Sequence, residues 1–334
     1  MQSLTSRGGL AAVTATLGAG IAILSNERVV ERRRLRLERL QKFDECGTLR
    51  VTASEFTTLP FDTPLVITGL LEDWRAPRTW TFVSLRKRLG HASVDIGSLS
   101  NDGVPFYAVA DNAMRQSPGR HDLGLAVFDA DFSTQSGKSS LLDDWRPLHL
   151  LTSGDLFSAG KAASHPDRPD WRWLLVAPPG SGSPIHQDPW MYSSWNASIV
   201  GRKRWVFFPP TVPRSVLHPL QPGVVGTALN FVGLGGYRMP AEFFDEVLPC
   251  LREAGLGHIE LLQKPGDVVA FPAGWWHAVV NLDATIAVTE SYGEPRNLVA
   301  IIESLRAGKL ASFADVLASE AQHHVQYRGS PMKS

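Results

Sequence analysis

Short apolar runs separated by Pro and Gly dominate the second half of the chain. None of these runs keeps a helical period, and each is about as long as a strand. Strand-length runs bounded by turn residues are typical of a compact antiparallel sandwich or barrel. The runs are residues 171–179, 193–200, 203–210, 264–272, 277–282 and 285–292.

The regions on either side of these runs carry mixed patterns. Residues 64–74 predict a buried strand that enters a loop, and residues 81–90 predict a short helix capped by Thr81 and ended by Gly90. Residues 154–163 and the insert 241–255 are further helix candidates. Residues 297–308 and 313–324 are helical in pattern, and we expect them to pack outside the sheet or to mediate self-association as a homodimer.

These patterns divide the chain into four parts. Residues 1–47 form an N-terminal extension, 48–170 the N-terminal part of the catalytic fold, 171–292 the β core, and 293–334 the C-terminal helices. Within the extension, residues 8–24 are apolar but rich in Ala, Gly and Thr, and an arginine-rich stretch follows. A spanning helix needs about 20 strongly apolar residues, so we predict no stable membrane partner. Two interpretations stay open: a targeting segment within residues 1–40, or an N-terminal helix with a solvated arginine face.

Charge and cysteine content limit the binding partners and the cellular compartment that we expect. Thirty-three basic side chains balance thirty-three acidic ones, so the net charge does not predict binding to nucleic acid or to a membrane surface. Two cysteines, Cys46 and Cys250, cannot build a disulfide framework or a thiolate zinc site. We expect a reducing compartment, the nucleus or cytoplasm, unless residues 1–40 direct the chain to an organelle.

Candidate chemistry begins with His186 and Asp188, which project from the same face of an extended segment. With His277 from a later strand they would make a two-histidine, one-carboxylate set that leaves three metal positions open, typical of non-haem Fe(II) oxygenases. The pair by itself is a weak signal. The alternative is a surface turn between Pro184 and Pro189, with His277 a partly buried, hydrogen-bonded histidine.

The sequence around these residues resembles JmjC-domain Fe(II)- and 2-oxoglutarate-dependent oxygenases. The runs GSGSPIHQDPWMYSSWNASIVGRKRWVFFPP and QKPGDVVAFPAGWWHAVVNLDATIAVTESY are similar to the two metal-binding segments of that family, in particular of its bifunctional arginine demethylase and lysyl hydroxylase subgroup. The similarity extends over residues 50–292. It implies a mainly β fold: a double-stranded β-helix (cupin or jelly-roll) core, N-terminal α/β elements and C-terminal helices.

The resemblance also implies residue roles. His186, Asp188 and His277 would bind Fe(II), with 2-oxoglutarate and O2 as co-substrates. The co-substrate residues would be Lys203, Asn196, Ser183 and Thr289. The Lys203 cation, with three donors, suits the distal carboxylate of 2-oxoglutarate, and the Thr289 hydroxyl could share that carboxylate. The alternative for Lys203 is a solvated lysine in a hairpin turn.

One position departs from the subgroup. Where the subgroup has a tyrosine that hydrogen-bonds the co-substrate carboxylate, this chain has Ala126, and Tyr107 is a candidate to supply the phenol instead.

The implied function is hydroxylation of a lysine, arginine or other side chain of a protein, or demethylation through hydroxylation, with release of succinate and CO2. Two alternatives stay open: a JmjC hydroxylase acting on RNA nucleosides, and a catalytically silent cupin-fold binding or scaffold protein. A decayed site would be expected to lose a metal ligand or the lysine, and His186, Asp188, His277 and Lys203 are all present. The substrate depends on loops at the mouth of the barrel, residues 98–170 and 210–257.

Overall fold

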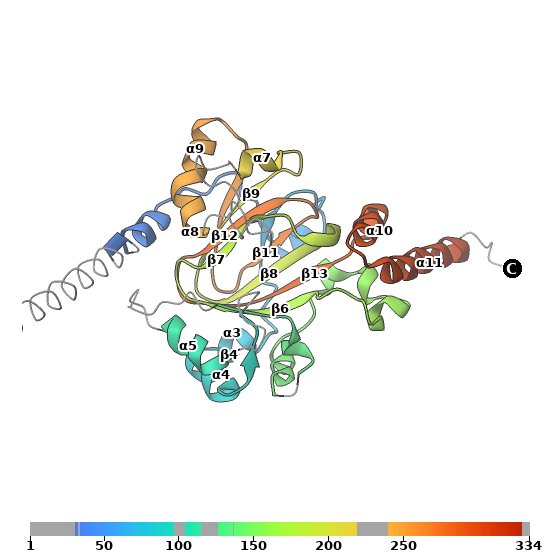
Figure 1. Cartoon of the computed structure of the whole chain (residues 1–334), viewed down its shortest axis with the longest axis horizontal. Helices are drawn as coiled ribbons and strands as arrows, with labels where there is room; N and C mark the ends of the chain where they lie inside the picture. The colour runs from blue at the N-terminus through green and yellow to red at the C-terminus, as the bar shows by residue number, and fades with distance from the viewer. Residues whose placement is uncertain are drawn as a thin grey trace, which may run out of the picture.

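The computed structural model describes residues 31–96 without residue 33, 104–114, 126–218 without residue 136, and 240–328. Two sheets form its centre, with helices around them (Figure 1). The larger sheet has seven strands, in the spatial order β1 (Arg50–Thr52), β2 (Leu65–Thr68), β11 (Val268–Phe271), β8 (Ser193–Val200), β13 (Thr285–Tyr292), β6 (Arg172–Ala177) and β5 (Val127–Asp129). The smaller sheet has four, in the order β10 (Ile259–Gln263), β9 (Lys203–Phe208), β12 (Trp276–Asn281) and β7 (Gly182–His186).

Nearly all strand pairs in these two sheets are antiparallel, the exception being the parallel β1–β2 pair. A separate two-stranded ribbon pairs β3 (Ser93–Val94) with β4 (Val104–Pro105). The β8–β9 hairpin turns at Gly201, whose φ of 80° favours glycine. Strand β9 begins at Lys203, directly after this turn.

The larger and the smaller sheet pack against each other through their inner faces. Their shared apolar cluster takes Val269 and Phe271 from β11 and Trp205, Phe207 and Val279 from β9 and β12. Because successive residues of a strand alternate between faces, the same strands also have outward apolar side chains. Both faces are covered, so β8, β9 and β12 are buried along almost their whole length.

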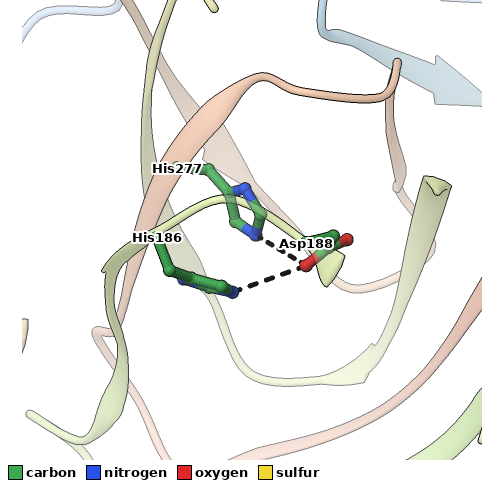
Figure 2. Close-up of side chains that lie close together, drawn as sticks. All are labelled: His186, Asp188 and His277. Atoms are coloured by element: carbon green, nitrogen blue, oxygen red, sulfur yellow. Dashed lines mark ion pairs between the residues drawn. The ribbon is translucent and has the colours of Figure 1, made fainter. Parts of the chain in front are cut away.

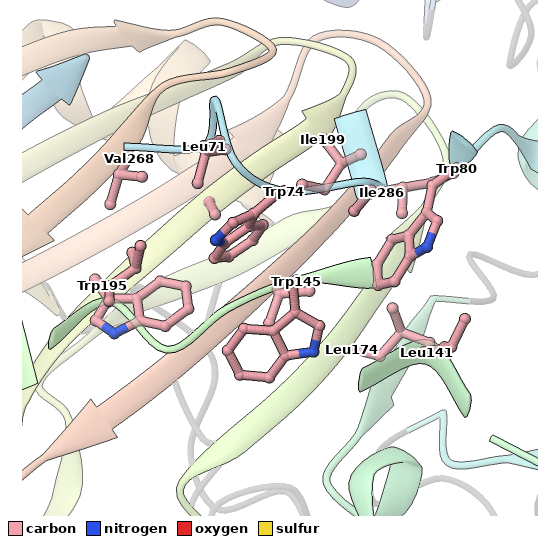
Figure 3. Close-up of a cluster of buried hydrophobic side chains, with 14 of the residues drawn as sticks. Leu71, Trp74, Trp80, Leu141, Trp145, Leu174, Trp195, Ile199, Val268 and Ile286 are labelled. Atoms are coloured by element: carbon pink, nitrogen blue, oxygen red, sulfur yellow. The ribbon is translucent and has the colours of Figure 1, made fainter. Parts of the chain in front are cut away.

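Helices of residues 48–170 cover the outer face of the larger sheet. Three tryptophans, Trp74, Trp145 and Trp195, meet there with ring centroids 5.4 to 6.3 Å apart (Figure 3). Aromatic rings with these spacings contribute both buried area and favourable edge contacts. The helices of this region are α2 (Ala53–Phe56), α3 (Ala76–Thr79), α4 (Phe82–Leu89), α5 (Phe106–Met114), α6 (His149–Thr152) and the 3₁₀ turns η1 (Asp131–Ser133), η2 (Ser139–Asp144), η3 (Leu156–Ser158) and η4 (Gly160–Ser164).

The insert after β9 covers the outer face of the smaller sheet, where Phe243, Phe244 and Leu248 pack with Phe208 and Val280. It comprises α7 (Arg214–Leu217), α8 (Pro240–Glu242), the π-helical η7 (Phe243–Val247) and α9 (Leu248–Glu253). The helical prediction for residues 241–255 is confirmed, with a π-helical turn inside it.

The arginine-rich segment is helical at residues 34–40 and docks on this insert. Nε and Nη2 of Arg39 donate to the Asp245 carboxylate, at 2.7 and 2.6 Å, and Nε of Arg36 lies 3.4 Å from it. Arg34 and Arg39 are 53% and 57% exposed, so the arginine face is solvated, and two of its residues in addition pair with the insert. Residues 8–24 lie outside the described residues. No helix among those that are described is both long and apolar enough to cross a membrane.

The C-terminal helices lie at one end of the larger sheet (Figure 1). After η8 (Pro295–Asn297), α10 (Leu298–Ala307) and α11 (Ala311–Arg328) form a hairpin. Their apolar residues Ile301, Leu305 and Phe313 pack with Phe157 and Tyr192 of the same chain. The predicted packing of these helices outside the sheet is confirmed, and the homodimer stays a prediction.

Three further outcomes concern helices. Thr81 caps α4 through a capping box and Gly90 ends it, as predicted. The description of the fold as mainly β is wrong: the β core is present, but the described residues hold more helix than strand, so the fold is mixed. Residues 154–163 form two short 3₁₀ turns, too brief to show a helical period.

Candidate metal centre

Two paired strands bring the histidines together. His186 ends β7 and lies opposite His277 of β12 in the antiparallel register, with ring centroids 4.1 Å apart. Asp188 follows two residues later, where the chain leaves the sheet. Its Oδ1 lies 3.5 Å from Nε2 of His186 and 3.6 Å from Nε2 of His277 (Figure 2). One ligand atom from each of the three residues lies within 4.8 Å of the others, close enough to share one ion.

Hydrogen bonds fix the direction of these side chains. Nδ1 of His186 lies 2.7 Å from the Pro184 carbonyl, and Nδ1 of His277 lies 3.1 Å from the Trp275 carbonyl. A proton on each Nδ1 satisfies these carbonyls and leaves both Nε2 lone pairs facing Asp188. The other Asp188 oxygen accepts a hydrogen bond of 2.5 Å from the Ser194 hydroxyl, which lies 2.9 Å from the hydroxyl of Ser291.

The charges of the three groups suit a divalent cation. Burial lowers the pKa of His277 to about 4, with the charge of His186 adding to the effect. Burial also opposes ionisation of Asp188, but the positive charge of the two imidazoles when they are protonated and the hydrogen bonds from His186 and Ser194 outweigh it and lower the pKa of the carboxyl to about 2. The site thus combines an ionised carboxylate with imidazole nitrogens, the donor set preferred by Fe(II) in facial triads.

The three residues line a cavity of about 390 Å³ between the sheets. A second cavity of about 420 Å³ extends from it towards Lys203. The two have common walls, made by Phe128, Leu175, Ser183, Asn196, Trp205 and Val279. The cavity of the histidines and the cavity of the lysine therefore adjoin across these residues.

Lys203 is buried in the second cavity, 3% exposed. Its ammonium lies 3.1 Å from the side-chain oxygen of Asn281, its partner in the β9–β12 register. Within the part of the chain that the structure describes, no carboxylate lies within ion-pair distance of it. Burial lowers the pKa of Lys203 to about 8. A buried cation opposite a neutral amide is costly unless an anion joins it, so this chamber fits the carboxylate of a bound acid.

The other expected co-substrate residues divide between the two cavities. Ser183 and Asn196 line both, and the Asn196 side-chain oxygen is buried with no hydrogen-bond partner among the described residues. Thr289, opposite Asn196 in the β8–β13 register, lines only the cavity of the histidines. Its hydroxyl donates to the Trp195 carbonyl at 2.6 Å. Thr289 can therefore offer only lone pairs to a ligand.

Ala126 lies in the wall of the lysine cavity, as the comparison with the subgroup suggested. Tyr107 does not. It lies on α5, 38% exposed, with its ring 5.7 Å from that of His91, and it lines a different hollow. The expectation that Tyr107 supplies the missing phenol is wrong, because α5 packs on the outer side of the larger sheet.

Two residues that the sequence interpretation missed support the site. Asn281 positions the lysine ammonium, and Ser194 holds the carboxylate of Asp188. Asn281 could have been found, because His277, Val279 and Asn281 alternate along one strand and share its inner face.

Comparison with known proteins adds independent information. Residues 55–294 match the cupin-like domain family. The chain is 32% identical over 244 residues to the arginine-specific demethylase JMJ22 of Arabidopsis thaliana, which covers 73% of this chain and 44% of that protein. It is 29% identical over 243 residues to the bifunctional arginine demethylase and lysyl-hydroxylase psr-1 of Caenorhabditis elegans, covering 70% and 56%.

A shorter match concerns a third kind of relative. Over 132 residues the chain is 33% identical to the 2-oxoglutarate and iron-dependent oxygenase JMJD4 of Mus musculus, covering 39% of this chain and 28% of that protein. The chain thus spans about half the length of the two relatives that it matches over most of its own length.

Proposed function

Because the chain belongs to the cupin-like domain family, and within it to the JmjC-type oxygenases, we propose that it hydroxylates a side chain of a protein substrate. Its cofactor is Fe(II), and its co-substrates are 2-oxoglutarate and O2. When bound, Fe(II) with its two co-substrates would supply the oxidising chemistry: one oxygen atom of O2 enters the substrate and the other enters succinate, while 2-oxoglutarate loses CO2.

One observation carries the proposal: the cavity of His186, Asp188 and His277 adjoins the chamber of a buried lysine that has no carboxylate partner among the described residues. The two Nε2 atoms and the Asp188 carboxylate would hold the metal. The Lys203 ammonium would bind the distal carboxylate of 2-oxoglutarate. The Asn196 side chain lines both cavities, and its amide nitrogen would donate a hydrogen bond to the bound acid.

Apolar side chains would protect the reaction from water. Trp205, Phe271 and Val279 line the cavity behind His277 and pack into the core between the sheets. Excluding water strengthens the electrostatic contacts of the bound acid and suppresses side reactions.

The cavity wall favours a cationic substrate side chain. Phe128, 45% exposed, stacks on Trp173 with ring centroids 5.6 Å apart, and both line the cavity of the histidines. Aromatic faces attract cations. The relatives with names that specify a substrate act on arginine or lysine, so we propose a lysine or arginine side chain.

The experiment measures succinate formation with peptide libraries and RNA, together with the mass change of the substrate. A gain of one oxygen atom indicates hydroxylation, and loss of a methyl group with formaldehyde release indicates demethylation. Trp173→Ala should raise the KM for a cationic peptide while substrate-independent succinate formation continues. Succinate formation stimulated by RNA and not by peptides would overturn the proposed substrate class. A metal-loaded protein that forms no succinate with any substrate would favour the scaffold alternative.

A further inference from the structure

The backbone next to Asp188 takes an unusual course. Trp190 and Met191, in the 3₁₀ turn η5 (Pro189–Met191), both have left-handed backbone angles, with φ of 57° and 56°. Large L-residues rarely adopt this region, and they persist there only when surrounding structure holds them. Asp188 is the residue at the start of this turn. The contacts that hold Trp190 therefore also influence the course of the backbone from the end of β7 through Asp188.

The C-terminal hairpin supplies that support. Helix α10 ends at Gly308, and a Cβ atom added there would lie 2.0 Å from Cη2 and from Cζ3 of Trp190. The indole thus rests directly on the glycine, where a larger residue does not fit. Trp190 and Met191 also pack against the apolar cluster that includes Ile301 and Leu305 of α10.

Trp190 also contributes to the metal cavity. It lines this cavity together with Asp188 and Pro189, while its ring rests on Gly308. One side chain therefore connects a metal-site wall with a helix more than a hundred residues later in the chain.

We infer that Trp190 is a positioning residue for Asp188, and that the α10–α11 hairpin holds it in place through Gly308. The C-terminal helices are then part of the catalytic unit. This inference rests on the proposed role of Asp188 as a metal ligand. It predicts that contacts on the outer surface of the protein affect metal binding.

The test is Gly308→Ala in the full chain, with the dissociation constant for Mn(II) measured below the unfolding temperature. We expect metal binding to weaken by roughly tenfold or more, the size of effect seen when groups that orient a ligand are lost. Val299→Ala is the matched control, because Val299 lies on the same helix and is 69% exposed. It should bind Mn(II) like the wild type. If Gly308→Ala lowers only the thermal stability and binds Mn(II) like the wild type, the inference is wrong.

A double variant separates positioning from a general loss of structure. Trp190→Phe removes the indole atoms that an alanine at position 308 would meet. Gly308→Ala combined with Trp190→Phe should therefore bind Mn(II) as Trp190→Phe alone does, and more tightly than Gly308→Ala. If the two effects simply add, Trp190 does not transmit the change.

Two remaining outcomes are also decisive. If Gly308→Ala does not fold, Trp190→Phe alone must weaken Mn(II) binding, and an unchanged constant would contradict the inference. If the wild type itself binds no Mn(II) or Fe(II), the proposed function fails first. The two failures are therefore distinguishable.

Discussion

The ammonium of Lys203 and the side-chain oxygen of Asn281 lie 3.1 Å apart on paired strands, buried within the sandwich. The amide orients the cation and leaves its charge unneutralised. A carboxylate at position 281 would form a salt bridge and occupy the cation permanently. The pair therefore keeps a positive charge available to an acidic ligand, at a cost in stability that the ligand offsets when it binds.

Replacing Lys203 with Met should abolish measurable 2-oxoglutarate binding and at the same time stabilise the unliganded protein. Burial lowers the pKa of the lysine from 10.5 to about 8. Each pKa unit corresponds to about 1.4 kcal/mol, so at neutral pH the gain in unfolding free energy should be on the order of 3–4 kcal/mol. Chemical denaturation and calorimetric titration with 2-oxoglutarate measure the two effects. A destabilised variant would show that the lysine is a structural contact.

Asn281→Asp should raise the KM for 2-oxoglutarate by about tenfold or more with little change in metal affinity. The new carboxylate would be nearly isosteric with the amide and would pair with Lys203, competing with the co-substrate. Asn297→Asp, at the half-buried N-cap of α10, is a matched control for the added charge. An unchanged KM would mean that the distal carboxylate binds elsewhere.

The affinity for 2-oxoglutarate should be nearly constant from pH 7 to about 8 and fall at higher pH. The ammonium is charged below its pKa, which burial lowers to about 8, and loses its charge above that value. The unfolded chain binds more protons than the folded one between about pH 8 and 10.5, so the Lys203 contribution to stability improves as pH rises through this window. A flat affinity profile up to pH 9.5 would contradict the assignment of the lysine.

Ser194→Ala should weaken metal binding by roughly tenfold, because the Asp188 carboxylate loses the hydroxyl that orients it. Ser198→Ala provides a closely matched control. Ser198 is buried on the same strand, and its hydroxyl donates to the Gly201 carbonyl, away from the metal cavity. Equal metal affinities for the two variants would show that Ser194 does not orient the ligand.

The core strands could be predicted because their patterns are local. Residues 193–200 and 285–292 coincide with β8 and β13. The estimate of a mainly β fold failed over residues 131–164, where the helical turns are three to six residues long and show no period. Local pattern thus identified the sheets and underestimated the helices around them.

The site depends on contacts that local pattern does not contain. The pairing of His186 with His277 depends on the register between strands distant in sequence. The residue pattern alone made His277 a candidate ligand, and the resemblance to known enzymes supported that choice. Alternation along β12 would have added Asn281. Nothing in the sequence near Trp190 predicts its contact with Gly308, because that contact depends on how a C-terminal helix packs.

Anaerobic addition of Fe(II) and 2-oxoglutarate tests the central claim most directly, because it reports metal and co-substrate in one complex without any knowledge of the substrate. The wild type should develop a weak visible metal-to-ligand charge-transfer band that requires both additions. Asp188→Ala should lack this band, and Lys203→Met should lack it while still binding Fe(II). A wild-type protein that binds Fe(II) but shows no band at saturating 2-oxoglutarate would contradict the oxygenase assignment.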